Sequence, residues 1–312
     1  MEQIIAVILP ILIILAAGYG SVFFKMLERS HIQAISQYII KIALPAFLLH
    51  ALSTRPFAEI WQAPYFFAYL IGSLLLFFGT YLLYRKWIQL PQTQAAVMGF
   101  GGSMSNTGFI GTAVLTLLIG QAAVPYLAMT LMIENIIMLT LMLVLAESGL
   151  SQHKSLHELC YASLKNISKN PVILSIIFGL IGSMLSIQWP DAVAFSLKSL
   201  AATASPLAIL VIGANLAGLD LKQIGQDVTI MCSIKLLLMP LVIGTALYLM
   251  PATTPQMLYA GIILAALPMA SAFGIYGQIY GIPERSAAPV MLSTLLSLLV
   301  IAAILHFVPS PF

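Results

Sequence analysis

Ten long runs of apolar residues follow one another along the chain, separated by short polar segments. Each run holds about 18–26 residues, which is the length that a helix needs to cross a hydrocarbon core of roughly 30 Å. The pattern therefore predicts an all-α, multi-pass membrane protein with ten transmembrane helices. The expected spans are residues 4–24, 34–52, 64–84, 94–119, 123–147, 171–188, 192–216, 228–249, 256–280 and 285–307.

The longest polar segment lies between the fifth and sixth runs and divides the chain into two halves of five spans. We therefore expect a first unit at residues 1–150, a cytoplasmic linker at 151–170 and a second unit at 171–312. The first run follows Met1, Glu2 and Gln3, without the basic residues that begin a signal peptide. It is expected to remain as a membrane span.

Composition excludes a soluble globular protein. Hydrophobic residues make up 61% of the 312 residues, charged residues make up 7%, and the mean hydropathy is +1.03. An ordinary soluble domain has about 25% charged residues. Cys160 and Cys232 are too few for a disulfide framework and have no metal-ligand neighbours. The chain also lacks phosphate-loop, catalytic-triad and metal-binding motifs, which predicts that it is not an enzyme and holds no cofactor or metal.

The basic residues are scattered through short loops, which makes them topology signals and not nucleic-acid contacts. If the N-terminus is extracytoplasmic, nine of them lie in inner loops and Arg55 alone lies in an outer loop. This bias predicts that both termini are extracytoplasmic. The nine are Lys25, Arg29, Arg85, Lys86, Lys154, Lys165, Lys169, Lys222 and Arg285.

Helix-breaking residues recur in the two halves at an offset of 161 positions. The matched pairs are Pro10 and Pro171, Gly18 and Gly179, Pro45 and Pro206, and Asn106 and Leu267, the last next to Pro268. Such self-similarity is typical of transporters built from structural repeats. Because each half has an odd number of spans, the second half must be inserted upside down, which predicts an inverted repeat.

Two runs are predicted to break near the middle of the membrane. The fourth contains five glycines and several small polar residues at positions 99–111, and the ninth carries Pro268 where a new half-helix could begin. Two half-helix N-termini would then meet, and their partial positive charges favour an anion, especially a carboxylate. The alternatives are a small-residue packing face in the fourth run and an ordinary proline kink in the ninth.

The residues of these two breaks form the predicted anion site. They are Ser105, Asn106, Thr107, Gly108, Pro268, Met269, Ala270 and Ser271. Asn106 or Thr107 is expected to cap the second half-helix of the fourth run. Pro45 and Pro206 are expected to bend the second span of each half as hinges.

Glu134 lies well inside the fifth run, beside Asn135. An ionised carboxylate at that depth is costly, so Glu134 should be protonated or paired and is a candidate for proton coupling. The alternative is a hydrogen-bonded packing residue. Lys235, inside the eighth run, is expected either to snorkel toward the interface or to pair with a carboxylate, and the first alternative is favoured. Glu134, Asn135 and Lys235 are thus the candidate coupling residues.

The sequence resembles the auxin efflux carrier family at four places in the same order. These are residues 102–111 (GSMSNTGFIG), 43–46 (ALPA), 204–208 (ASPLA) with 213–216 (GANL), and 267–268 (LP). The resemblance implies a five-plus-five inverted repeat of the bile-acid-symporter type, in which the broken fourth and ninth helices cross. It also implies transport of an organic anion. The chain departs from the family pattern at Thr112, where a proline is usual, and in its short central loop.

The expected function is therefore secondary transport of a small organic carboxylate, such as malonate or an auxin-like acid, across the cytoplasmic membrane. An anion channel and a membrane receptor that uses the same site are the alternatives, although a channel needs a continuous polar path. The expected partners are the organic anion, the lipid bilayer and H⁺ as a coupling ion, with a homodimer left open. No nucleic-acid partner is expected.

Overall fold

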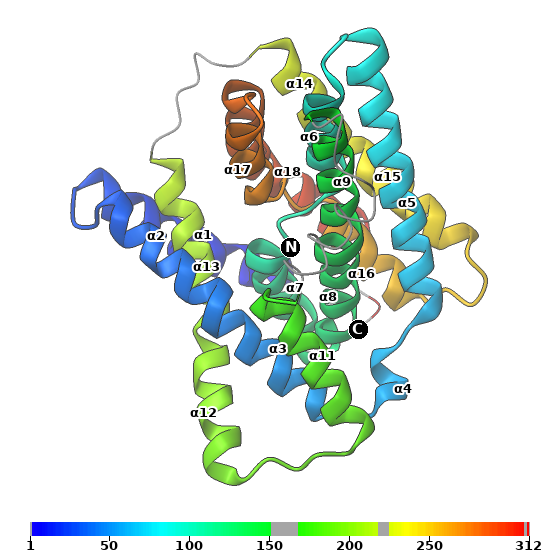
Figure 1. Cartoon of the computed structure of the whole chain (residues 1–312). Coiled ribbons are helices and arrows are strands. Elements are labelled where there is room, and N and C mark those ends of the chain that lie inside the picture. Colours follow the sequence, from blue (N-terminus) through cyan, green and yellow to red (C-terminus); the bar gives the residue numbers. More distant parts are fainter. Residues whose placement is uncertain (1, 151–167, 218–224, 309–310, 312) are drawn as a thin grey trace.

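The computed structural model describes residues 2–150, 168–217, 225–308 and 311. This part of the chain is helical throughout, apart from loops, and its β-structure is a single isolated bridge. Figure 1 shows the helices packed around a centre where α6, α7, α8, α16 and α17 meet. Residues 151–167 of the expected linker lie outside the described residues.

The first half contains helices that coincide with the first five apolar runs. In the following bounds η marks a π-helical segment, except for η4, which is a 3₁₀ helix. The helical elements of the first half are α1 (Glu2–Phe23), α2 (Arg29–Tyr38), η1 (Ile39–Ala43), α3 (Leu44–Ser53), α4 (Phe57–Ile60), α5 (Ala63–Leu82), η2 (Leu83–Trp87), α6 (Gln92–Ser103), η3 (Thr107–Gly111), α7 (Thr112–Ile119), η4 (Gly120–Ala122), α8 (Ala123–Met132), η5 (Ile133–Met138) and α9 (Leu139–Leu150).

The second half is also mainly helical in its described residues. Its elements are α11 (Pro171–Met184), α12 (Asp191–Ala202), α13 (Ala204–Leu216), α14 (Gln226–Ser233), η7 (Ile234–Leu238), α15 (Met239–Leu249), α16 (Pro255–Ala265), α17 (Ser271–Ile279) and α18 (Pro283–Phe307). The seventh run, expected as one span, contains α12 and α13, which meet at Thr203 and together form one stretch, Asp191–Asn215, that is long and apolar enough to cross a membrane. Among the described residues, six helical stretches, most of them joined from neighbouring helical segments, are long and apolar enough to cross a membrane.

Two π-helical segments each end two residues before a proline. Pro45 follows η1, and Pro240 follows η7. A proline has no N–H for the carbonyl four residues earlier, and its ring crowds that carbonyl. The helix therefore widens locally into a π-turn, a feature that is frequent at functional sites.

The long helices pack in a reciprocal pattern between the two halves. Helix α1 lies against α13, and α11 lies against α3. Gly18 of α1 faces the backbone carbonyl of Leu210, whereas a Cβ at Gly179 of α11 would lie 2.9 Å from Cβ of Leu52. The two glycines are one of the pairs that lie 161 positions apart in the sequence. Both allow a helix of one half to approach a helix of the other closely.

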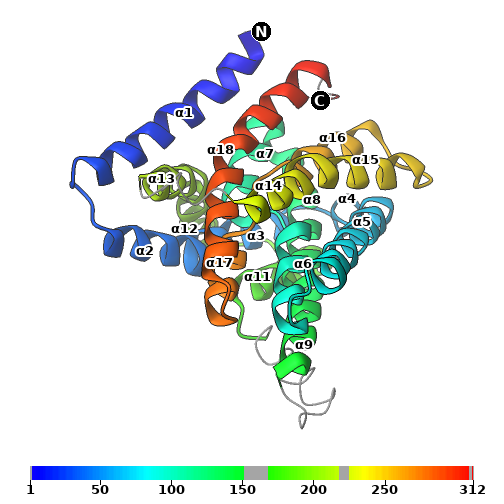
Figure 2. The ribbon, with the colours of Figure 1, turned by 90° about the horizontal axis from the view of Figure 1, so that it is seen from above.

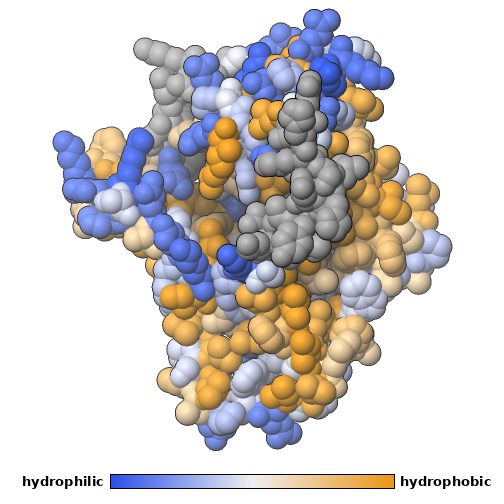
Figure 3. All heavy atoms as spheres, in the orientation of Figure 1, coloured by the Kyte–Doolittle hydropathy of each residue, from blue (hydrophilic) through white to orange (hydrophobic). Residues whose placement is uncertain are grey.

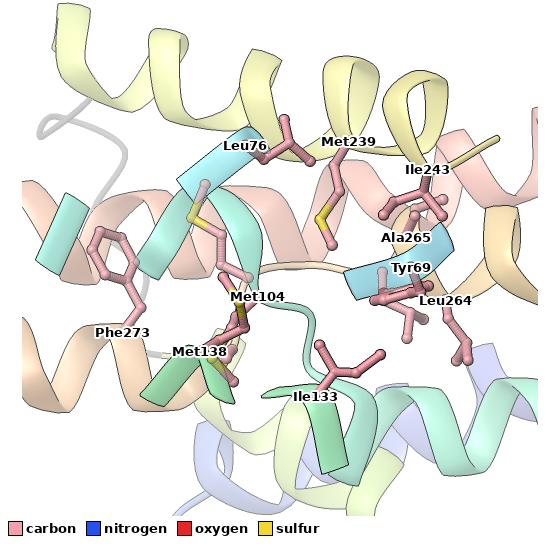
Figure 4. Close-up of a cluster of buried hydrophobic side chains, with 14 of the residues drawn as sticks. Tyr69, Leu76, Met104, Ile133, Met138, Met239, Ile243, Leu264, Ala265 and Phe273 are labelled. Carbon is pink, nitrogen blue, oxygen red and sulfur yellow. The ribbon is translucent and has the colours of Figure 1, made fainter. Parts of the chain in front are cut away.

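Glycines of α6 also have a packing role. A Cβ at Gly102 would lie 2.6 Å from Thr80 Oγ1 on α5, and a Cβ at Gly101 would lie 2.7 Å from the ring of Phe273 on α17. The small-residue packing face and the helix break are thus both present, at neighbouring positions. Figure 4 shows large apolar side chains around the two non-helical segments, among them Met239 and Ile133.

The outer surface suits a lipid environment. Large apolar side chains such as Phe195, Leu241 and Leu299 are 65–73% exposed. Soluble proteins rarely expose large contiguous patches of apolar side chains to water. Figure 3 shows hydrophilic residues gathered at the top, the left and the lower tip, with hydrophobic residues over the right flank and lower body. In Figure 2 the start of α1 and the end of α18 lie on one side, and the end of α9 lies on the opposite side.

Candidate anion site at two paired helix breaks

Two non-helical segments, residues 104–106 and 266–270, interrupt the fourth and ninth runs and pair with each other. Ser105 and Met269 form an antiparallel β-bridge, and the Asn106 N–H donates to the Pro268 carbonyl over 2.9 Å. Met104 is extended, with φ −115° and ψ 140°. The pairing satisfies backbone groups that a helix break would otherwise leave open.

Asn106 connects the two breaks with its side chain as well. Its Nδ2 donates to Ser271 Oγ at the start of α17 over 3.2 Å. The predicted capping of the next helix by Asn106 is wrong, because its side chain accepts no capping hydrogen bond. Its backbone carbonyl does accept from the N–H groups of Ile110 and Gly111. The amide therefore holds two half-helix starts together and leaves their first turns uncapped by Asn106.

Glu134 is the carboxylate of this centre. It lies in the π-helical segment η5 and is 2% exposed. Its Oε1 accepts from the Ser105 N–H at 3.0 Å and from the Thr107 hydroxyl at 2.9 Å. Both donors lie at the beginning of the half-helix that starts at η3, where negative charge is favoured. These hydrogen bonds agree with the alternative of a hydrogen-bonded packing residue, and the proton-coupling role of Glu134 stays a prediction.

Lys235 is buried completely, so the snorkelling interpretation is wrong. Its Nζ donates to the Ala265 carbonyl at 2.6 Å and to Ser105 Oγ at 3.0 Å. Ala265 is the last residue of α16, where the helix dipole favours a cation. Lys235 lies in η7, so both membrane-buried ionisable groups of this centre are carried by π-helical segments.

Ser105 joins the acid and the base. Its backbone N–H donates to Glu134, and its hydroxyl accepts from Lys235. A proton change or a movement at either ionisable group therefore acts on the same residue of the fourth-run break. The ninth-run break is held from its other side, because the Met269 N–H donates to Ser293 Oγ of α18 over 3.2 Å.

The eight predicted site residues differ in their access to solvent. Six are buried, namely Ser105, Asn106, Thr107, Pro268, Met269 and Ala270. Gly108 is half-buried, and Ser271 is exposed. The structure therefore brings all eight together but leaves only the beginnings of the two half-helices open to a ligand.

The remaining candidate residues are Asn135, Pro45 and Pro206, and in the part of the chain that the structure covers none of them is hydrogen-bonded to the two helix breaks. Asn135 donates from Nδ2 to the Leu131 carbonyl of its own helix at 2.9 Å, which directs its amide away from the breaks. Pro45 is half-buried at the start of α3, and Pro206 is exposed near the start of α13. In the described ranges, no three His, Cys, Asp or Glu side chains come together as metal ligands.

Two cavities flank the centre. One, of about 470 Å³, is lined by Ser271 and Gln278 of α17, by Asn215 of α13 and by Arg29 of α2. Sequence reasoning missed Arg29 as a site residue, because in the sequence it is one of several loop cations. The other cavity, of about 800 Å³, is lined on one wall by Thr112 and Thr116 of α7.

Comparisons with known proteins relate the chain to membrane transporters. A protein of Rhizobium meliloti (strain 1021) described as "Putative malonate transporter" is 27% identical over 99% of this chain and 97% of its own length. "Uncharacterized transporter YfdV" of Escherichia coli (strain K12) is 24% identical over 86% of this chain and 88% of its own. The profile of the family described as "Membrane transport protein" matches residues 3–306. The chain therefore belongs to this family of membrane transport proteins, the auxin efflux carrier family that its motifs resemble.

Proposed function

We propose that this protein is a secondary transporter that moves a small organic anion across the cytoplasmic membrane. Family membership supports transport, and the name of the Rhizobium relative supports a carboxylate such as malonate. The observation that carries the choice of an anion is the pairing of the two breaks, which brings the first turns of η3–α7 and α17 together. Free N–H groups and the positive ends of helix dipoles favour negative charge there.

The eight predicted residues divide the work of binding. Gly108 and Ser271, the two with access to solvent, contact the carboxylate from the two half-helices. Asn106 positions Ser271 and offers its second amide hydrogen to the anion. The buried residues Ser105, Thr107, Pro268, Met269 and Ala270 hold the backbone in this shape. Arg29 and Asn215 extend the site into the smaller cavity.

The proposed architecture is ten membrane-spanning helices in a five-plus-five inverted repeat, with the broken fourth and ninth helices crossing at the site. The reciprocal packing of α1 on α13 and of α11 on α3 supports it. In this architecture the helices α1, α3, α11 and α13 form a scaffold against which the other helices move, and Pro45 and Pro206 are hinges within the scaffold helices α3 and α13.

Both termini are proposed to be extracytoplasmic in the inner membrane, because nine of ten loop-borne positive charges then lie inside. Reporter fusions at Ser151 and after Phe312 are expected to report opposite sides of the membrane. Reports from the same side would contradict an odd number of spans in the second half, and with it the inverted repeat.

Proton coupling is proposed for Glu134, with Lys235 as its partner through Ser105. A proton taken up by Glu134 would weaken its hold on the Ser105 N–H and the Thr107 hydroxyl, which lie at the start of the anion-binding half-helix. Asn135, bonded to its own helix, lies outside this chain of contacts.

Binding tests the substrate class directly. Malonate is expected to raise the unfolding temperature of the detergent-purified protein, because a ligand of the native state stabilises it by about 2.7 kcal/mol at a hundred times its Kd. Malonamide, which has nearly the same shape without the charges, is the control and is expected to cause no shift. If no mono- or dicarboxylate shifts the unfolding temperature, the carboxylate assignment fails.

A further inference from the structure

The larger cavity has an unusual set of lining residues. It encloses about 800 Å³ between the end of α3, the α7 wall and the junction of α12 with α13. Three basic side chains line it, His50, Arg55 and Lys198, together with one acidic side chain, Glu59. The smaller cavity has Arg29 as its one lining Lys or Arg. The positive groups are thus concentrated in the cavity that lies against α7.

The two strong cations of this cavity are available to a ligand. Within the parts of the chain that the structure describes, neither Arg55 nor Lys198 forms an ion pair with a carboxylate. Arg55 is half-buried, and its backbone is fixed because its carbonyl accepts from Ser183 Oγ at 2.5 Å and its N–H donates to Leu52. Lys198 reaches the same cavity from α12 on the other half of the chain.

His50 adds an unsatisfied polar atom to this wall. Its Nδ1 is buried and has no hydrogen-bond partner among the described residues. Lys198 lies within electrostatic range of the same imidazole. A buried polar atom without a partner costs free energy, which an oxygen-rich or water-bridged ligand would recover. Glu59 is exposed and offsets only one of the two permanent positive charges.

The position of the cavity relates it to the helix breaks. Thr112 and Thr116 lie one and two turns after η3 begins, so the α7 wall runs from the cavity toward Gly108. Phe47, two residues after Pro45, and Ser205, next to Pro206, also line the cavity. The lining therefore extends from the Arg55 loop to the two hinge prolines.

We propose that this cavity is a second binding site, which takes a dicarboxylate by pairing one carboxylate with Arg55 and the other with Lys198, beside His50. The site is distinct from the paired breaks and lies on the route to them. Low-dielectric walls that carry cations raise the local concentration of an anion and its on-rate. Two separated cations favour a dianion over a monoanion, because each carboxylate needs its own counter-charge. The choice of a dicarboxylate as the anion rests on the proposed transport function, whereas the cavity and its cations do not.

A thiol introduced on the α7 wall can report on this site without any transport. In a chain in which Cys160 and Cys232 are replaced by serine, Thr116→Cys places one thiol on that wall. The rate at which this thiol is labelled is measured in detergent with a negatively charged and with a positively charged thiol reagent of similar size. The ratio of the two rates reports the local charge. We expect Arg55→Gln with Lys198→Gln to lower the anionic-to-cationic rate ratio by about tenfold. Lys41→Gln with Lys86→Gln, which removes the same charge away from the cavity, is expected to leave the ratio unchanged.

Protection by malonate then tests binding. Malonate is expected to slow labelling of the introduced thiol in the parent Thr116→Cys chain and after Asn106→Leu, but not after Arg55→Gln with Lys198→Gln, and acetate is expected to protect far less. Three results would overturn the second site. They are protection of the thiol by malonate after both cations are lost, no protection in the parent chain, and protection in the parent chain that disappears after Asn106→Leu. If protection is as expected but the parent chain transports no carboxylate, the proposed function fails and this site remains.

Discussion

Replacing Asn106 by leucine is expected to weaken malonate binding by roughly 10- to 150-fold. Asn106 is the residue that joins the two breaks, through its N–H to Pro268 and its Nδ2 to Ser271. Leucine has a similar volume but no donor, and a hydrogen bond to a charged group contributes about 1.5–3 kcal/mol. Calorimetric titration of the purified variant with malonate measures the change.

Asn135→Leu is the matched control for this substitution. It makes the same chemical change one helix away, but Asn135 is bonded to the Leu131 carbonyl of its own helix. We expect its malonate affinity to equal that of the parent chain. In the Arg55→Gln with Lys198→Gln background, which removes the second proposed site, a folded Asn106→Leu protein that binds malonate with unchanged affinity would place the anion site elsewhere.

Replacing Glu134 by glutamine is expected to remove the pH dependence of transport and to destabilise the protein. Glutamine keeps the shape and the accepting oxygen for Ser105 and Thr107, but it cannot take up a proton. It also leaves the buried Lys235 without the negative charge that is linked to it through Ser105, and a buried charge that loses its counter-charge lowers the unfolding temperature. Uptake into proteoliposomes over a pH series, with thermal unfolding of the same preparation, measures both effects.

Lys235→Met in the Glu134→Gln background separates the two roles. If the charges stabilise each other, the double variant unfolds at a higher temperature than Glu134→Gln alone, because no unpaired charge remains. The double variant should still lack the pH dependence. A Glu134→Gln protein with the pH profile and rate of the parent chain would reduce Glu134 to a packing residue.

Helix positions could be predicted because the membrane leaves few alternatives. Backbone groups in lipid must be satisfied within a helix, so each long apolar run becomes helical. The fourth-run break was also readable, since Ser105 and Asn106 follow a cluster of glycines in the middle of the run. The seventh run is one stretch long enough to cross a membrane, as expected, but the boundary between α12 and α13 within it was not predicted, because Thr203 has no local sequence feature that distinguishes it from neighbouring small residues.

Tertiary contacts decided the features that the sequence left open. Lys235 looked like a snorkelling residue, because hydropathy does not reveal that the Ala265 carbonyl ends a helix 2.6 Å from its amine. Pro240 was a usable but missed signal for the π-segment that carries Lys235. Arg29 and Arg55 were assessed only as topology charges, and Lys198 was not among the loop charges that were counted. Their places in two cavities depend on packing between helices of different halves.

Counterflow of radiolabelled malonate into proteoliposomes tests the central claim, that this chain is a carboxylate carrier, most directly. Vesicles loaded with unlabelled malonate are expected to accumulate external label transiently above equilibrium, because a carrier exchanges one substrate molecule for another at an alternating site. The overshoot should saturate with malonate and be lost in the Asn106→Leu protein. Label that only equilibrates without an overshoot, as through a channel, or that enters no faster than into protein-free vesicles, would contradict the account.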